Sequence, residues 1–447
     1  MTSTVPLPDL LTGSPYLSYT YAYPHKTAYR TLEPAVPLRD VWASERKSSL
    51  FLYLHIPFCE MRCGFCNLFT VANAPQPLEQ AYLDALERQA EQVKEALGDA
   101  TFSRIALGGG TPTYLEARDL ERVFDLLGRT FGATPAAMPT SVESSPATAT
   151  PDRLAVLAER GVSRVSIGVQ SFVESEVHSV GRAQKNAEVA LALGNIRAAG
   201  IPELNIDLIY GLAHQTPQSW LYSLQEALRW SPEELFLYPL YVRPLTGIGR
   251  LGRSWDDERL ELYRLGRDFL LSAGYVQTSV RRFQKTDLPL GSELEYSCQQ
   301  DGMVGLGCGA RSYTRSLHYS SEYAVGAVGV REILSDFVTR PGEGFSVAAH
   351  GLHLSTDEQR RRYVLQSLLH VTGLHLGQYR ELFGSDAYAD FPALPGLTET
   401  GLAETELARQ DGGVLRLTPA GLERSDAVGP RLYSAEVQAL SEGYVWK

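Results

Sequence analysis

From Leu50 onward the chain alternates between short apolar runs and longer amphipathic stretches, and this alternation constrains the fold more than any other feature. The apolar runs have the length of strands and lie at 50–56, 104–107, 140–143, 164–167, 204–210 and 235–240. Between the first two, Leu78–Leu97 carries apolar side chains at helical spacing, and Gly98 follows as a helix stop. Repeated strand–helix pairs predict parallel strands joined by crossover helices, in an open sheet or a partial barrel.

The length of 447 residues predicts one large α/β domain and a smaller one. We expect an N-terminal extension covering the barrel at 1–49 and the barrel itself at 50–290. A glycine-rich segment at 291–354 is expected to complete the active site, and a helical or winged-helix-like domain is expected at 355–447. In α/β folds of this kind, ligands bind at the carboxyl ends of the strands.

The composition narrows the possible partners and the location. The net charge of -11 disfavours nucleic acid and anionic membranes as partners. No run approaches the ~18 apolar residues that span a bilayer, and the first residues do not resemble a secretory signal. Five cysteines, three of them clustered, do not form a disulfide framework. We therefore expect a cytoplasmic protein.

The three clustered cysteines, Cys59, Cys63 and Cys66, have the spacing Cys-x3-Cys-x2-Cys and follow the first apolar run. Thiolates are the ligands of iron–sulfur clusters. Structural zinc is the alternative, but it needs four ligands, and no nearby Cys or His pair supplies the fourth. Three thiolates leave one iron of a [4Fe–4S] cluster open to S-adenosylmethionine (SAM). Cleavage of SAM at that iron gives a 5′-deoxyadenosyl radical. Cys298 and Cys308 are expected to be buried apolar residues, with hydrogen donation as the alternative.

A glycine-rich turn, Gly108-Gly-Gly-Thr-Pro-Thr113, follows the second predicted strand. Consecutive glycines let the backbone approach a ligand closely and offer it N–H and C=O groups. Behind the cysteine loop, the expected ligand is the methionine part of SAM.

These motifs resemble those of the radical SAM family of oxygen-independent coproporphyrinogen III oxidases. Besides the cysteine loop and GGGTPT, the shared segments are 165–172 (VSIGVQSF), 205–212 (NIDLIYGL) and 417–422 (LTPAGL). The resemblance implies a partial (β/α)6 barrel, a coproporphyrinogen-oxidase-like C-terminal domain, a [4Fe–4S] cluster and two SAM molecules.

The same resemblance implies a set of cofactor contacts. One SAM would be held by Phe65, Gly110, Thr111, Gln170, Arg182 and Asp207. The other would be held by Tyr53, Gly109 and Glu143. Tyr241 and Arg311 occupy further family positions near the cofactors but differ in type from the usual residues.

Three branches of this family are possible. The oxidases carry another cysteine two residues after the third ligand, where this chain has Leu68. The heme chaperones have a His-Asn-x-x-Tyr-Trp segment, where this chain reads Glu295–Gln300. The preferred prediction is therefore a class C radical SAM methyltransferase that methylates an sp2 carbon of a natural-product or peptide substrate. Its reductant would be a flavodoxin or ferredoxin. The oxidase and the heme chaperone remain as alternatives.

Overall fold

A computed structural model describes residues 10, 13–249, 258–286, 301–398 and 406–447 of the chain. The chain divides into two compact units. The larger unit comprises Tyr29–Trp255, Ser297–His353 and Val445–Lys447, and the smaller one comprises Met1–Ala28, Asp256–Tyr296 and Leu354–Tyr444. The four-part division expected from the sequence stays a prediction.

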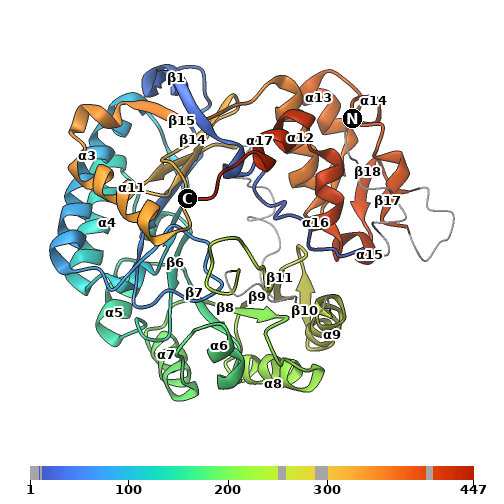
Figure 1. Cartoon of the computed structure of the whole chain (residues 1–447), viewed down its shortest axis with the longest axis horizontal. Coiled ribbons are helices and arrows are strands. Elements are labelled where there is room, and N and C mark those ends of the chain that lie inside the picture. The colour runs from blue at the N-terminus through green and yellow to red at the C-terminus, as the bar shows by residue number, and fades with distance from the viewer. Residues whose placement is uncertain (1–9, 11–12, 250–257, 287–300, 399–405) are drawn as a thin grey trace. The chain divides into compact units, whose positions relative to one another are not determined.

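The larger unit is built on one long, mostly parallel sheet (Figure 1). Its parallel strands are, in spatial order, β12 (Met303–Leu306), β2 (Leu50–Ile56), β5 (Phe102–Gly109), β6 (Thr140–Ser144), β7 (Arg164–Gln170), β8 (Glu203–Tyr210) and β9 (Glu234–Pro239). Beyond β12 the sheet continues with antiparallel strands: β13 (Arg311–Tyr313), β14 (Leu317–Ser320), β15 (Val347–His353) and β1 (Arg30–Pro37). β1 stands at one edge of the sheet, and its one neighbour in the strand order is β15, so the sheet is not closed.

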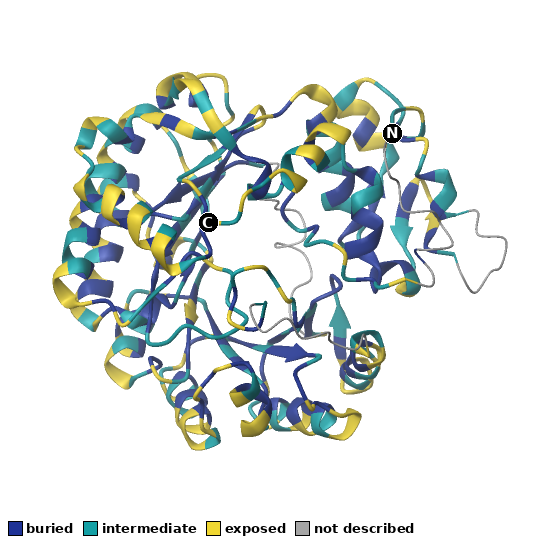
Figure 2. Ribbon diagram, viewed as in Figure 1, coloured by how far each residue is buried: buried dark blue, intermediate teal, exposed yellow. Residues whose placement is uncertain are grey.

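Helices cover the outer face of this sheet (Figure 1). They are α2 (Leu38–Trp42), α3 (Gln76–Leu97), α4 (Ala117–Phe131), α5 (Pro151–Glu159), α6 (Glu174–Ser179), α7 (Asn186–Ala198), α8 (Pro217–Leu228) and α11 (Ala327–Thr339). The alternating burial along β2 shows which face of the sheet these helices cover. Leu50, Leu52 and Leu54 are fully buried, whereas Phe51 and Tyr53 on the other face are only partly buried. Figure 2 shows that exposed residues gather on the outer sides of the helices, while buried residues predominate in the strands. Because side chains alternate along a strand, one face forms the core and the other is available for ligands.

The smaller unit is mainly helical. Its elements are α9 (Arg259–Ser272), β10 (Tyr275–Gln277), β11 (Arg282–Lys285), α12 (Thr356–Leu368), β16 (Leu374–His375), α13 (Leu376–Phe383), α14 (Ala387–Asp390), β17 (Ala408–Asp411), β18 (Val414–Leu417), α15 (Pro419–Leu422), α16 (Ser425–Val428) and α17 (Ala435–Glu442). The LTPAGL segment forms the start of α15, where the hydroxyl of Thr418 accepts from the N–H of Gly421 at 3.1 Å. A Cβ atom on Gly421 would lie 1.8 Å from the carbonyl oxygen of Leu407, so only glycine fits.

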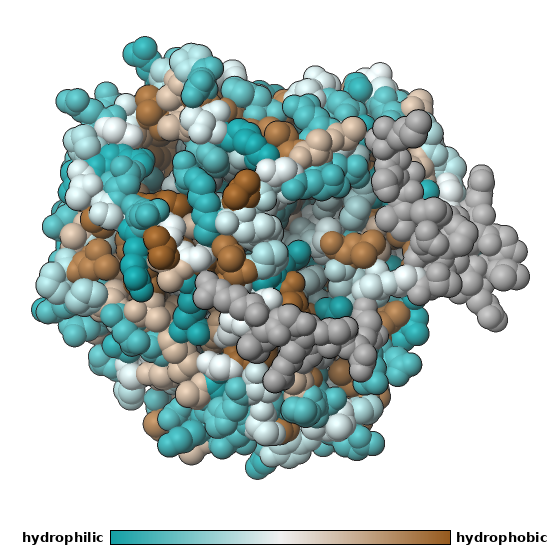
Figure 3. Space-filling model, in the orientation of Figure 1, coloured by the Kyte–Doolittle hydropathy of each residue, from teal (hydrophilic) through white to brown (hydrophobic). Residues whose placement is uncertain are grey.

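The predicted fold class, a partial α/β barrel with a helical C-terminal part, is confirmed. Each of the six predicted strands is present, and the predicted helix at 78–97 is α3. Cys308 is fully buried, and Cys298 lies outside the described residues. Among the described helices, none is both long and apolar enough to span a bilayer. The face shown in Figure 3 is largely hydrophilic, with apolar side chains scattered over it.

Candidate cluster and SAM site

The cysteine loop leaves the carboxyl end of β2 and is fixed at both of its ends. Cys59 ends the short strand β3 (Phe58–Cys59), which pairs with β4 (Val71–Ala72) on the far side of the loop. In the middle of the loop, the N–H of Gly64 donates to Val180 at 2.7 Å, and its carbonyl accepts from the N–H of Ile248 at 2.9 Å. A Cβ atom on Gly64 would lie 2.7 Å from the Val180 oxygen. The loop can therefore pass between these two segments only because this residue is glycine.

Each of the three thiols has a polar neighbour. The Sγ atom of Cys59 lies 3.4 Å from the hydroxyl of Thr111, and that of Cys66 lies 3.9 Å from the hydroxyl of Thr70. The Sγ atom of Cys63 lies 3.3 Å from a guanidinium nitrogen of Arg182. Burial raises the pKa of Cys59 to about 12 and also raises that of Cys66. Thiolates bind iron, so loading of this loop must release protons.

The residues present fit a [4Fe–4S] cluster better than a single metal ion. In the part of the chain that is described, no three His, Cys, Asp or Glu side chains converge on one point. A mononuclear ion needs such convergence, whereas in a cluster each thiolate binds a different iron. Cys59, Cys63 and Cys66 would hold such a cluster and leave one iron without a protein ligand.

The glycine-rich turn after β5 lies against the start of the cysteine loop. The N–H groups of Gly110 and Thr111 donate to the carbonyls of Ile56 and Phe58, each at 2.7 Å. A Cβ atom on Gly110 would lie 2.5 Å from the Phe58 oxygen, so the two backbones can approach this closely only at a glycine. The turn thereby brings Gly109, Gly110 and Thr111 beside the predicted cluster ligand Cys59.

Tyr53, Gly109 and Glu143, predicted to hold one SAM, are close together. The N–H of Gly109 donates to the Glu143 carboxylate at 3.1 Å. A Cβ atom built on Gly108 would lie within 3.1 Å of both Glu143 and the Tyr53 hydroxyl. The Glu143 side chain is exposed to solvent, although many protein atoms surround its carboxylate.

Two acidic groups on this face have raised pKa values. Burial, with the nearby charge of Asp207, raises the pKa of Glu143 to about 7. Burial also raises the pKa of Asp207 to about 6, although the side-chain amide of Asn205 donates to it at 2.7 Å. Burial and the charge of Glu143 raise the pKa of Tyr53, whereas the charge of Arg311 lowers it. Arg311 therefore acts on the same face as Tyr53.

The other predicted contacts lie around the cysteine loop and at the strand ends. Phe65 packs against an apolar cluster that includes Val180 and Ile209. Gln170 ends β7 in a left-handed conformation, with a φ of 70°, opposite Leu208 on β8, whereas Asp207 on β8 is opposite Gly168. Tyr241 lies just after β9, where the guanidinium of Arg243 stacks on its ring at 5.0 Å. The contact roles of these residues stay predictions.

His55 is a site residue that the sequence reasoning did not single out. It is 4% exposed, and its Nδ1 and Nε2 atoms lie 3.2 Å from the Tyr53 hydroxyl and 2.9 Å from the Phe69 carbonyl. It therefore connects a predicted SAM contact with the end of the cysteine loop. Its position two residues after Tyr53, on the same face of β2, was the available signal.

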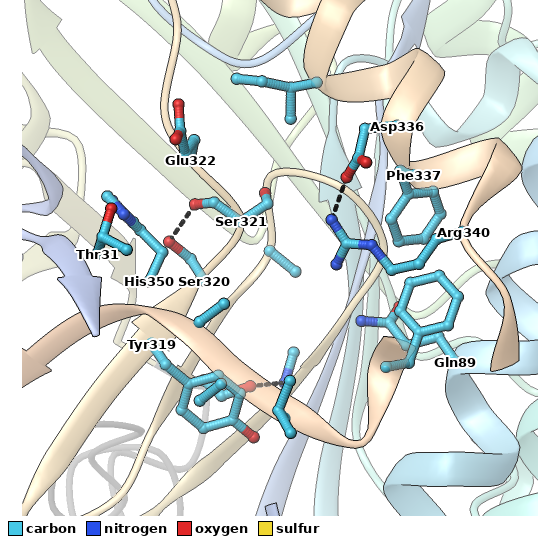
Figure 4. Close-up of a pocket in the computed structure, with 18 of the residues that line it drawn as sticks. Thr31, Gln89, Tyr319, Ser320, Ser321, Glu322, Asp336, Phe337, Arg340 and His350 are labelled. Carbon is cyan, nitrogen blue, oxygen red and sulfur yellow. Dashed lines mark hydrogen bonds and ion pairs between the residues drawn. The ribbon is translucent and has the colours of Figure 1, made fainter. Parts of the chain in front are cut away.

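A separate cavity of about 420 Å³ lies between the antiparallel end of the sheet and helices α3 and α11 (Figure 4). Its wall includes Ser312, Glu322, His350 and the ion pair between Asp336 and Arg340. None of the predicted cluster or SAM residues lines this cavity. The cysteine loop and the carboxyl ends of the parallel strands therefore form a different site.

A family model described as "Radical SAM superfamily" matches residues 53–227, which include Tyr53, the three cysteines and the glycine turn. Over these residues the chain is similar to the radical SAM superfamily. It is 28% identical over 360 residues to the heme chaperone HemW of Bacillus subtilis, covering 78% of this chain and 91% of that protein. It is 29% identical over 429 residues to the oxygen-independent coproporphyrinogen III oxidase of Paracoccus denitrificans, covering 91% and 90% of the two chains. The solved structure of the Escherichia coli coproporphyrinogen III oxidase matches the fold, with a TM-score of 0.76, 24% identity, and coverage of 91% and 97%.

These comparisons overturn the prediction of a class C methyltransferase. The relatives that match most of the chain are coproporphyrinogen III oxidases and heme chaperones. The prediction rested largely on Leu68, which replaces a cysteine of the oxidases. A difference at this one position weighs less than a similarity to the oxidases that covers 91% of this chain.

Proposed function

We propose that the protein is a radical SAM enzyme that oxidatively decarboxylates propionate side chains of a porphyrinogen. The observation that carries this proposal is the extent of the similarity to the coproporphyrinogen III oxidases. The match to the Paracoccus denitrificans oxidase covers 91% of this chain and 90% of that one, and therefore extends well beyond the superfamily segment at 53–227.

The bound cluster and SAM would supply a radical that removes a hydrogen atom from the substrate. Each propionate that becomes a vinyl group would lose CO2, one hydrogen atom and one electron. The hydrogen atom would pass to the 5′-deoxyadenosyl radical, and the electron would pass to an external one-electron acceptor, which the reaction needs in addition to the reductant. In this proposal the cysteine loop holds the cluster, and the turn at Gly109–Thr111 positions SAM beside it. Asp207 would accept a hydrogen bond from a ribose hydroxyl of SAM, and the amide of Gln170 would donate one to a ribose hydroxyl. Glu143, with a pKa of about 7, accepts hydrogen bonds from a polar group of the cofactor.

Two SAM molecules are part of the proposal, because the predicted contacts form two sets. Equilibrium dialysis of the reconstituted protein with labelled SAM should give two molecules bound per chain. Glu143→Gln should weaken one of these sites and leave the other unchanged. A single bound SAM in the wild-type protein would contradict this part of the proposal.

The decarboxylation is tested under anaerobic conditions with reconstituted protein, SAM, a chemical reductant and coproporphyrinogen III. We expect protoporphyrinogen IX and 5′-deoxyadenosine to form. Cys63→Ala should abolish both iron loading and product formation. If the fully loaded protein cleaves SAM but never converts the porphyrinogen, the proposed substrate is wrong. A flavodoxin or ferredoxin remains the proposed natural reductant, and the cytoplasmic location remains a prediction.

A second candidate function is heme delivery, as in the heme chaperones. It is favoured by the match to the Bacillus subtilis chaperone, of which this chain covers 91%. The segment at 295–300, on which the sequence argument against this function rested, lies outside the described residues. Stoichiometric, tight heme binding without turnover of coproporphyrinogen III would favour the chaperone over the oxidase.

A further inference from the structure

Arg182 makes a contact that its predicted role does not explain. The sequence places Arg182 among the SAM contacts, but in the structure its Nη1 atom lies 3.3 Å from the Sγ atom of Cys63. The neighbours of the other two thiols are the neutral hydroxyls of Thr111 and Thr70. Cys63 is therefore the ligand whose sulfur has a cation within hydrogen-bonding distance, whereas the charge of Arg62 acts on Cys66 without a hydrogen bond to its sulfur among the described contacts.

The guanidinium of Arg182 is held in place by two more hydrogen bonds. Its Nη2 atom donates to the carbonyl of Gly168 at 2.6 Å, and its Nε atom donates to the side-chain oxygen of Gln184 at 2.8 Å. Arg182 is only 8% exposed. The planar guanidinium thus connects three acceptors, so its direction toward Cys63 is fixed by geometry and not by chance.

Gln184 is oriented in turn by the end of β7. Its amide nitrogen donates to the carbonyls of Val169 at 2.9 Å and Ser171 at 3.3 Å, which leaves its oxygen facing Arg182. Gln184 is 3% exposed and lies behind the arginine. The segment 180–184, which contains Arg182 and Gln184, also holds the cysteine loop, because the N–H of Gly64 donates to the carbonyl of Val180. Both Arg182 and the neighbour of Cys63 in the loop are therefore fixed by this segment.

We propose that Arg182 donates a charge-assisted N–H···S hydrogen bond to the Cys63 thiolate and raises the reduction potential of the cluster, with Gln184 as its positioning residue. Reduction adds one negative charge to the cluster, and a buried cation with its N–H directed at a ligand sulfur stabilises that charge. This inference rests on the cluster assignment and is independent of the porphyrinogen substrate.

The test is a redox titration of the reconstituted cluster without SAM, followed by electron paramagnetic resonance. Omission of SAM removes any effect of Arg182 on SAM binding. At a fixed potential near the wild-type midpoint, Arg182→Gln should lower the ratio of reduced to oxidised cluster about tenfold, which corresponds to 59 mV for one electron. Gln184→Met leaves the arginine in place but removes its support, and should lower the ratio about threefold. Arg160→Gln, which changes an arginine paired with Asp125 away from the loop, is the matched control and should leave the ratio unchanged.

Iron and sulfide content separates this proposal from a purely structural role. Variants that load four irons and still show the lower ratio support the proposal. Should Arg182→Gln fail to assemble its cluster, Gln184→Met carries the same test, since it removes the hydrogen bond that directs the guanidinium toward Cys63. Fully loaded variants with an unchanged midpoint, whether or not SAM binds more weakly, would overturn it. Failure of the porphyrinogen assay would not affect this result.

Discussion

Asp207 is a single residue whose ionisation should limit the stability of the fold. Its pKa rises from an ordinary value of 3.8 to about 6, mainly because of burial. Between these two values the folded chain binds more protons than the unfolded chain, so the free energy of unfolding falls as the pH rises from about 4 to 6. In Asp207→Asn this fall in the free energy of unfolding is absent, and the new side-chain oxygen can still accept a hydrogen bond from the Asn205 amide.

At pH 8 we expect Asp207→Asn to be more stable than the wild type by about 1–2 kcal/mol, after allowance for partial solvent screening. At pH 3.5 the difference should nearly vanish, because Asp207 is then protonated in the folded state and mostly protonated in the unfolded state, where its pKa is 3.8. Urea unfolding of the cluster-free protein at the two pH values measures this. An equal difference at both pH values would show that the effect does not come from the carboxylate charge.

Arg281 and Asp426 form a buried ion pair in the smaller unit, where both side chains are at most 6% exposed. The guanidinium of Arg281 also lies over the rings of Tyr19 and Tyr21, at 4.8 and 4.7 Å. Removal of one partner of such a pair leaves a buried charge without its counter-ion. Asp426→Ala should therefore lower the free energy of unfolding by about 3–5 kcal/mol.

Circular dichroism during urea unfolding measures this loss. The matched control is Glu226→Ala, which breaks a pair with the exposed Arg229 and should cost under about 0.5 kcal/mol. Similar costs for the two variants would mean that the buried pair contributes no more than a surface pair does.

At the scale of elements, the cysteine loop depends on its close contacts with two other segments. A methyl group at Gly64 would collide with the backbone oxygen of Val180, which cannot move as a flexible side chain would. We expect Gly64→Ala to displace the loop and lower the iron content after reconstitution by at least about half, since the ligand geometry of a cluster tolerates little displacement. Gly377→Ala, at a helix position with open space, is the control and should load normally. Normal loading of Gly64→Ala would show that the loop is less constrained than these contacts suggest.

The elements that could be predicted from the sequence are those with a strong local pattern. The six parallel strands and α3 show periodicity over enough residues to be recognised. The antiparallel extension through β13, β14 and β1 was not predicted. β13 and β14 are three and four residues long, and β1 pairs with β15 more than three hundred residues away. Such pairings depend on the tertiary fold and leave little trace in a local pattern.

In the candidate site, too, contacts between separate segments could not be predicted from local patterns. The cysteine ligands and the glycine turn could be read from spacing alone, because each is a continuous segment. The contacts of Arg182 with Cys63 and of His55 with Phe69 could not, because they join segments that only the folded sheet brings together. Leu68 illustrates the opposite error, in which one local difference received more weight than the similarity along most of the chain.

At the scale of the whole chain, residues Val445–Lys447 follow the smaller unit in sequence but belong to the larger unit. The backbone oxygen of Lys447 accepts from the N–H groups of Val325 and Gly326, at 2.8 and 2.7 Å. The ring of Trp446 packs edge-on against that of Tyr323. These contacts hold the segment at 323–326 immediately before α11.

The same segment contacts the cysteine loop. The Tyr323 hydroxyl donates to the carbonyl of Asn67 at 2.9 Å, and the guanidinium of Arg62 donates to the carbonyl of Val325. Residues at the end of the sequence therefore support the cluster ligands through one intermediate segment. Deletion of residues 445–447 should lower the free energy of unfolding by about 1–3 kcal/mol, the net worth of two backbone hydrogen bonds. It should also speed the loss of iron to a chelator.

Lys447→Ala is the matched control for this deletion. It keeps the backbone oxygen and removes only the exposed ion pair with Glu322, so it should cost less than about 1 kcal/mol and retain iron as the wild type does. Iron release to a chelator, followed by absorbance, and urea unfolding are measured on the same three proteins. If the deletion lowers stability but iron release stays at the wild-type rate, the tail stabilises the fold without supporting the cysteine loop. Faster iron release in the deletion alone is the result that the contacts at Asn67 and Val325 require.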